Sequence, residues 1–263
     1  MKQFNIRFGR YVDESISNKL SESHCHDSYE ILLVLSGNGK YIVEGVDYTV
    51  APGTLMLIRP FAYHHLSLCL DSPYERYLIH FHRSDLSPDA VKLLDNMSSS
   101  VEDNVLYYPR RTLSNTLISV FDRFEVAEAL PREEKEAYLR NLVSELVILL
   151  SASSAEKIVQ SEDELGGRVI RYLNNNIERD ISLDKLAKRF FVSKYYLCRA
   201  FKKHNGVSVH GYLTNKRIMY AKQLIESGET ASGAAYKVGF GDYSAFYRAY
   251  IKIIGSSPTS LLK

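Results

Sequence analysis

The chain has 263 residues, of which 45% are hydrophobic and 24% are charged, and its formal net charge at pH 7 is +2. This length and composition are ordinary for one large or two medium-sized globular domains, and they exclude a fibrous or disordered chain. No segment is apolar enough to span a membrane, and the N-terminal segment lacks the apolar core of a signal peptide. The three cysteines are widely spaced, which argues against a disulfide framework. We therefore expect a cytoplasmic protein.

Residues 1–95 predict a β-domain. A mostly apolar run at residues 30–36 ends at a Gly-Asn-Gly turn, and residues 40–44 follow with alternating polarity. Further short runs, separated by turn residues, lie at residues 48–50, 54–60, 64–68 and 75–82. Short strands at this spacing are typical of an antiparallel barrel or sandwich, and we expect a barrel.

Residues 96–152 predict a helical hairpin. Apolar side chains recur at helical spacing from Leu113 to Phe124 and from Tyr138 to Leu150. Their wide apolar faces can cover both the barrel and a second subunit, so we expect a homodimer through this hairpin; packing on the barrel alone is the alternative. Residues 153–163 are small and polar, and we assign them as a linker.

Residues 164–263 predict an all-helical domain that binds double-stranded DNA. Residues 161–263 hold 17 Lys and Arg against 9 Asp and Glu, whereas residues 1–160 hold 16 against 22. Two helix-turn-helix patterns, at about 182–204 and 231–253, flank a long predicted helix. A short helix that braces a longer one lays the longer helix in a major groove. A solvated basic face on an ordinary bundle is the alternative.

The second helix of the first unit is the predicted recognition helix. Ser193 is its expected N-cap, and Leu197 and Phe201 point inward. Arg199 can donate two hydrogen bonds to a guanine edge. The outward positions are Lys194, Tyr195, Tyr196, Cys198, Arg199, Lys202 and Lys203, the last two being suited to phosphates.

From about Gly166 to Lys263 the chain resembles the DNA-binding domain of AraC/XylS transcription regulators. The markers are Leu186-Ala187, Ser193, Leu197, Arg199, Phe201-Lys202-Lys203, Gly206, Arg217, Ala221, Gly239-Phe240, Asp242, Phe246, Arg248, Gly255 and Pro258. The resemblance implies that both units enter major-groove segments and that the protein contacts RNA polymerase as an activator; repression is the alternative. The implied base-reading residues are Tyr195, Cys198 and Arg199 in the first unit and Tyr243, Ser244, Tyr247 and Arg248 in the second.

The second unit departs from the family pattern. Ala231 and Ala234 stand where bulky aliphatic residues are usual, and Tyr250-Ile251-Lys252 replaces a Phe-Lys-Lys run. We therefore expect its first helix to bury less apolar area and its recognition helix to make fewer phosphate contacts. The second unit is predicted to bind DNA more weakly than the first.

The N-terminal domain resembles a cupin barrel. His24, His26 and Glu30, followed by Gly37, match the first cupin signature, and His64 stands at the metal-ligand position of the second. Three histidines and a carboxylate suit Fe, Mn, Ni or Zn. However, strand alternation alone places both rings of a His-x-His pair on one face, and regulators of this architecture keep such histidines without metal. We assign no metal or other cofactor; the candidate ligands are these three histidines and Glu30.

The barrel is instead predicted to hold a small effector. The candidate pocket residues are His24, His26, Glu30, Tyr41, His64 and His80. Polar rings and a carboxylate suit a sugar or another polyol. The expected fold is therefore an α+β two-domain chain, with a cupin-like barrel and hairpin followed by an all-α DNA-binding domain.

The function predicted is that of a sequence-specific, ligand-responsive transcription regulator rather than an enzyme. Two alternatives stay open. One is a metal-dependent cupin enzyme with an appended DNA-binding domain, and the other is a regulator whose barrel only dimerises.

Overall fold

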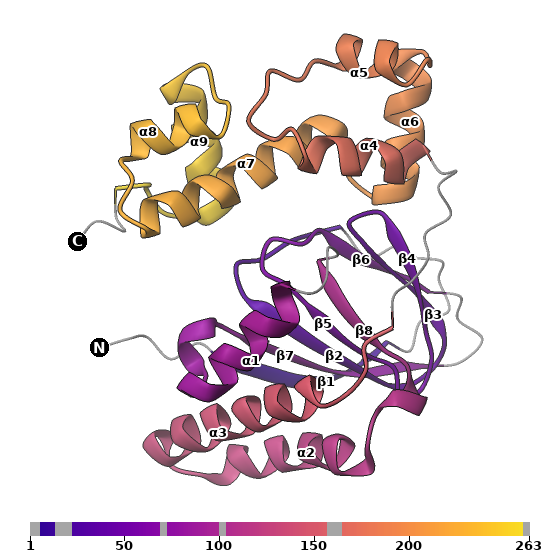
Figure 1. Cartoon of the computed structure of the whole chain (residues 1–263), viewed down its shortest axis with the longest axis vertical. Coiled ribbons are helices and arrows are strands. Elements are labelled where there is room, and N and C mark those ends of the chain that lie inside the picture. The colour runs from indigo at the N-terminus through magenta and orange to yellow at the C-terminus, as the bar shows by residue number, and fades with distance from the viewer. Residues whose placement is uncertain (1–5, 14–22, 69–72, 100–103, 157–164, 260–263) are drawn as a thin grey trace. The chain divides into compact units, whose positions relative to one another are not determined.

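The computed structural model describes residues 6–13, 23–68, 73–99, 104–156 and 165–259. The chain divides into two compact units, residues 1–160 and 161–263. Unit 1 contains antiparallel sheets and helices, whereas the described part of unit 2 contains helices and turns without strands (Figure 1). The predicted α+β two-domain class is confirmed. In the described ranges, no helix is both long and apolar enough to cross a membrane.

Two antiparallel sheets form the framework of unit 1. Their strands are β1 (Arg7–Asp13), β2 (Tyr29–Ser36), β3 (Gly39–Val43), β4 (Val46–Val50), β5 (Leu55–Ile58), β6 (His64–Leu68), β7 (Tyr74–Phe81) and β8 (Val105–Tyr108). The larger sheet has the order β1-β7-β2-β5-β8, and the smaller has the order β4-β3-β6. The sequence pattern missed β1, which is largely exposed, and β8, which lies inside the range expected to hold only the helical hairpin.

The larger sheet is buried on both faces, which explains the unbroken apolar run in β2. Ile31 and Leu33 belong to the core shared with the helices, whereas Leu32 and Val34 belong to the core between the sheets. The covering helices are α1 (Pro88–Ser99), α2 (Asn115–Val126) and α3 (Arg132–Ser151), which lie along one face of the larger sheet (Figure 1). The space between the two sheets is therefore the interior of the barrel.

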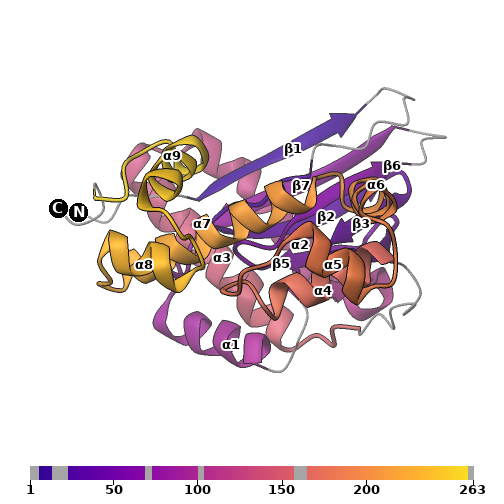
Figure 2. The ribbon, with the colours of Figure 1, turned by 90° about the horizontal axis from the view of Figure 1, so that it is seen from above.

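Unit 2 contains two helix-turn-helix units joined by a long helix (Figures 1 and 2). Its helices are α4 (Leu165–Asn174), α5 (Leu183–Arg189), α6 (Lys194–Asn205), α7 (Val209–Glu226), α8 (Ala231–Lys237) and α9 (Tyr243–Ile254). The five N-cap side chains Ser182, Ser193, Ser208, Thr230 and Asp242 each accept a backbone N–H, which fixes where α5 to α9 begin.

Arg217 of α7 ties the segment after α4 to this frame. Its Nε donates to the carbonyl of Ile177 at 2.9 Å, and its guanidinium also donates to the carbonyl of Arg179 at 2.6 Å. Gly239, in the turn between α8 and α9, has φ +89° and lies against the same place. A Cβ on Gly239 would lie 2.8 Å from the Glu178 carbonyl oxygen. The turn of the second helix-turn-helix unit therefore packs against the segment between α4 and α5.

Candidate functional site

The interior of the barrel centres on the carboxylate of Glu30. Glu30 is 2% exposed and pairs in register with His80 of β7 and with Ile58 of β5. Side chains that are opposite each other on neighbouring strands share a face, so Glu30 and His80 both face the smaller sheet, as Leu32 does. Tyr41 of β3 and His64 of β6 approach from the smaller sheet.

Four side chains surround this carboxylate. Tyr41 donates its hydroxyl to Oε1 at 3.2 Å, and Nε2 of His26 lies 3.0 Å from Oε2. Nε2 of His64 lies 3.5 Å from Oε2 and that of His80 lies 3.7 Å from it. A buried carboxylate requires such partners, because burial without hydrogen bonds or a counter-charge is strongly unfavourable.

Backbone carbonyls hold two of the imidazoles in place. Nδ1 of His64 donates to the carbonyl of Ala62 at 2.9 Å, and Nδ1 of His26 lies 2.9 Å from the carbonyl of Ser28. Because Nδ1 is engaged by the backbone in each ring, Nε2 is the nitrogen that each ring presents to Glu30. The orientation of the cluster is thus set by the chain itself.

The electrostatics of the cluster favour an ionised Glu30. Burial opposes ionisation, but the neighbouring His64 and the hydrogen bond from His26 outweigh it and hold the pKa of Glu30 well below its usual value. Burial likewise opposes the protonation of His64, yet the adjacent Glu30 carboxylate raises its pKa. For His80 burial dominates and lowers the pKa to about 4.

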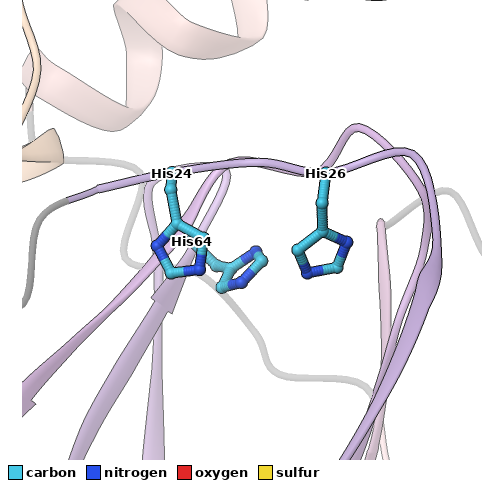
Figure 3. Close-up of side chains that lie close together, drawn as sticks. All are labelled: His24, His26 and His64. Atoms are coloured by element: carbon cyan, nitrogen blue, oxygen red, sulfur yellow. The ribbon is translucent and has the colours of Figure 1, made fainter. Parts of the chain in front are cut away.

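His24 adds an exposed imidazole at the edge of the cluster. Its ring centroid lies 4.5 Å from that of His64, and Figure 3 shows the two rings side by side with His26 next to them. Donor atoms of His24, His26 and His64 all lie within 4.8 Å of one another, and so do those of His26, Glu30 and His80. Nε2 of His64 is buried, and among the described residues its polar neighbour is the Glu30 carboxylate at 3.5 Å. Either donor set fits a divalent transition metal.

The structure brings together all six predicted pocket residues and adds two that the sequence pattern did not identify. Ser28 is fully buried, and its hydroxyl lies 3.1 Å from Nδ1 of His26 and 3.4 Å from Nδ1 of His80. Tyr74 is fully buried, and its hydroxyl has no hydrogen-bond partner among the described residues. Strand alternation could have found both, since Ser28 is in phase with Glu30 and Tyr74 with His80.

The recognition helix α6 exposes the residues predicted for DNA. Tyr195 is 76% exposed, and Arg199, Lys202 and Lys203 are exposed without an ion pair in the described part of the chain. Lys194 is exposed but pairs with Asp184 of α5 at 2.9 Å. Leu197 and Phe201 are buried, as expected. Tyr196 is exposed, and Cys198 is half-buried. The outer face of α6 is therefore basic and aromatic.

The second recognition helix, α9, is less basic. Ser244, Tyr247 and Arg248 are exposed, whereas Tyr243 is half-buried, with its ring 5.7 Å from that of Phe246. The preceding α8 buries only alanines, namely Ala231, Ala234 and Ala235, against α7 and the aromatic side chains of α9.

Comparison with known proteins identifies both units. The AraC-like ligand-binding domain model matches residues 12–151, and a helix-turn-helix domain model matches residues 186–263. The HTH-type transcriptional activator RhaS of Enterobacter sp. (strain 638) is 26% identical over 249 residues, which cover 90% of this chain and 86% of that protein. RhaS of Klebsiella pneumoniae (strain 342) is also 26% identical, over 95% of this chain and 90% of that protein.

Two solved structures also align with this chain. ToxT from Vibrio cholerae O395 is 15% identical, and the alignment covers 98% of this chain and 96% of that one with a TM-score of 0.40. The C-terminal domain of AraT, a response regulator from Geobacillus stearothermophilus, is 27% identical over 39% of this chain and 86% of that one, with a TM-score of 0.37. With both domain models in sequence, this chain belongs to the AraC family and is a DNA-binding transcription regulator with an N-terminal ligand-binding domain.

Proposed function

We propose that the regulator responds to a small polyhydroxylated effector, such as a sugar, bound between the two sheets of unit 1. The observation that carries this proposal is the buried Glu30 carboxylate and the polar atoms around it. Among the described residues, the buried hydroxyl of Tyr74 has no hydrogen-bond partner, and Nε2 of His64 faces only the Glu30 carboxylate, at 3.5 Å. Hydroxyl groups both donate and accept hydrogen bonds, so a polyol can satisfy an imidazole nitrogen, a phenol and a carboxylate together.

Effector binding is proposed to change how the two helix-turn-helix units engage DNA. A ligand shifts an equilibrium only through its different affinities for the two states, so the effector must bind unit 1 more tightly in the DNA-competent state or in its alternative. The proposed partner is a second copy of the chain, through α2 and α3, and the proposed outcome is activation through RNA polymerase. Its relatives are named activators, which supports this direction.

DNA reading is proposed to depend mainly on α6. Arg199 is the proposed guanine-reading side chain, with Tyr195 and Cys198 beside it, and Lys194, Lys202 and Lys203 contact phosphates. Tyr243, Ser244, Tyr247 and Arg248 of α9 are proposed to read a second groove segment more weakly. The smaller number of cations on α9 supports this order.

The effector is tested by calorimetric titration of the purified protein with a panel of sugars and polyols, in parallel with Glu30→Gln. We expect one compound to bind the wild type and to bind the variant at least about tenfold more weakly, because one charge-assisted hydrogen bond is lost. Binding that is equal in the two proteins would place the effector elsewhere. Metal content is measured on the same samples, and a stoichiometric metal with turnover would favour the enzyme alternative.

DNA specificity is tested by selection from a random duplex library at fixed salt. An enriched motif in the wild type that is lost in Arg199→Ala supports reading through α6. Binding without any enriched motif, falling steeply with salt, would mean that only phosphate contacts operate. Sedimentation of the protein with and without the selected duplex tests the dimer.

A further inference from the structure

A second binding surface lies on the first helix-turn-helix unit, away from the predicted base-reading residues. It is a depression between α4 and the C-terminal end of α5, where the ring centroids of Tyr172 and Phe190 lie 6.0 Å apart. Its lining consists of four cationic and two aromatic side chains: Arg168, Lys185, Lys188, Arg189, Phe190 and Phe191. No acidic side chain contributes to this lining. We call it the α4–α5 depression.

Phe191 is the most unusual residue of this surface. It is 94% exposed, the largest exposure among the exposed large apolar side chains of the described residues. It also has φ +57°, a left-handed conformation that disfavours side chains with a Cβ by about 1–2 kcal/mol. Glycine or asparagine would suit such a turn better. A phenylalanine at this position therefore costs free energy both through its backbone conformation and through the exposure of its ring to water. A contribution to the stability of the fold does not explain why it stands there.

Two of the four cations of the depression lie over aromatic rings, and one of the four has an acidic partner. The Arg168 guanidinium lies 5.5 Å from the Phe190 ring centroid, and that of Arg189 lies 4.4 Å from the Tyr172 ring centroid. A stacked guanidinium keeps its N–H edge available for a carboxylate. Among the described residues, Arg168, Lys188 and Arg189 have no ion pair; Lys185 pairs with Asp180 at 2.6 Å, and both are largely exposed.

Part of the depression faces away from the start of the recognition helix. The ion pair between Asp184 and Lys194 marks the side of α5 that faces the N-terminal end of α6. At about 100° per helical residue, Lys188 lies about 40°, Lys185 about 100° and Arg189 about 140° around α5 from Asp184. Lys185 and Arg189 therefore point away from the first turn of α6, whereas Lys188 lies on the side that faces it.

We propose that the α4–α5 depression binds an acidic protein segment that carries an apolar side chain, supplied by a partner protein. The unpaired guanidinium and ammonium groups complement carboxylates, and Phe190 and Phe191 cover the apolar side chain. Aromatic residues and arginine are the side chains that concentrate binding energy at protein interfaces. The phosphates of a nucleic acid would pair with the cations but would leave Phe191 exposed to solvent. Nucleic acid binding therefore explains the charged side chains of the depression and not the exposed aromatic one.

The test uses the full-length protein with its DNA-reading helices saturated by a duplex. The probes are a fluorescein-labelled oligoglutamate peptide with a central leucine and the same peptide with a central serine, followed by fluorescence anisotropy. The wild type is expected to bind the leucine peptide about fivefold more tightly or better, because leucine burial contributes that much. The variant Phe191→Asn is expected to lose this preference for the leucine peptide. Because asparagine tolerates the left-handed backbone conformation, the domain stays folded in this variant.

Two further variants separate charge from apolar contact. Arg168→Gln with Arg189→Gln is expected to weaken both peptides, while Lys237→Gln, on the second unit, leaves them unchanged. The DNA affinity and its salt slope stay as in the wild type. Three outcomes would overturn the proposal. The wild type could bind the two peptides equally, Phe191→Asn could leave peptide binding unaltered, or the arginine variants could show a shallower salt dependence of DNA binding. A change in self-association on Phe191→Asn would overturn it as well, since the occupant would then be a second copy.

Discussion

Oε2 of Glu30 lies 3.0 Å from Nε2 of His26, and Nδ1 of the same imidazole lies 2.9 Å from the carbonyl of Ser28. One ring thus connects a buried carboxylate to the backbone that precedes β2. If the Glu30 side chain lost its contact with His26, the buried carboxylate would lose the nearest partner of Oε2. The effector site and the stability of unit 1 therefore depend on the same carboxylate.

Glu30→Gln is expected to lower the stability of unit 1 by about 1–3 kcal/mol, because the amide keeps the shape but removes the counter-charge of His64. The measurement is the urea midpoint followed by circular dichroism, at neutral pH and in the presence of a chelator. The matched control is Glu128→Gln, whose side chain is 62% exposed and pairs with Lys135 on the surface. Identical midpoints for the two variants would contradict a structural role for Glu30.

Acidification is expected to destabilise unit 1 through His80. Its pKa falls to about 4 in the folded chain from 6.5 in the unfolded one, because burial disfavours the imidazolium. The unfolded state therefore binds more protons between these values, and stability is lost as pH falls from 6.5 towards 4. The lowered pKa of Glu30 changes the stability of unit 1 only below the ordinary pKa of a glutamate. The raised pKa of His64 changes it only above pH 6.5.

His80→Asn isolates this effect. Between pH 7 and 5 the wild type should lose on the order of 1–2 kcal/mol more stability than the variant, in chelator-treated protein. Urea unfolding at several pH values provides the measurement. Parallel curves for the two proteins would show that His80 is not the titrating group.

The sequence predicted those features of the fold that depend on short-range pattern. The N-caps Ser182 and Ser193 placed the first helix-turn-helix unit, and the apolar periodicity placed α2 and α3. β1 was missed because most of its side chains are exposed, so it lacks an apolar run, and β8 because it has only four residues and lies in a range whose other apolar residues have helical spacing. Local pattern reveals a strand only where its side chains alternate or are buried over a longer run.

The same distinction separates the two parts of the candidate site. His24, His26 and His64 were found because residue type and spacing single them out. Strand alternation could place Tyr74 on the same face as His80, but it was missed because a tyrosine in a strand usually packs as core; that its buried hydroxyl has no partner among the described residues is seen only in the tertiary structure. The exposure of Phe191 was likewise invisible, since phenylalanine in a turn between amphipathic helices predicts a buried side chain.

Gly239→Ala is expected to destabilise unit 2 by about 2–4 kcal/mol. Its φ of +89° disfavours any Cβ, and the new methyl group would lie 2.8 Å from the Glu178 carbonyl oxygen and 2.9 Å from the Arg217 guanidinium. Gly255→Ala is the matched control, because Gly255 has φ +80° with no atom within 4 Å of the added Cβ. The control should lose only about 1 kcal/mol. Equal losses in urea unfolding would show that the contact between Gly239 and Arg217 contributes nothing.

Arg199→Ala and Arg248→Ala are expected to affect DNA binding unequally. Both arginines are exposed on a recognition helix, but Arg199 is followed three and four residues later by Lys202 and Lys203, whereas Arg248 is followed at these places by Ile251 and Lys252. The cations on α6 hold that helix closer to the phosphates, so Arg199→Ala should lose about 1–3 kcal/mol and relax the selected motif at one position. Arg248→Ala should lose less and leave the motif nearly unchanged. Competition binding of both variants to the selected duplex measures this at fixed salt, and equal losses of affinity and sequence preference would show that the two units contribute alike.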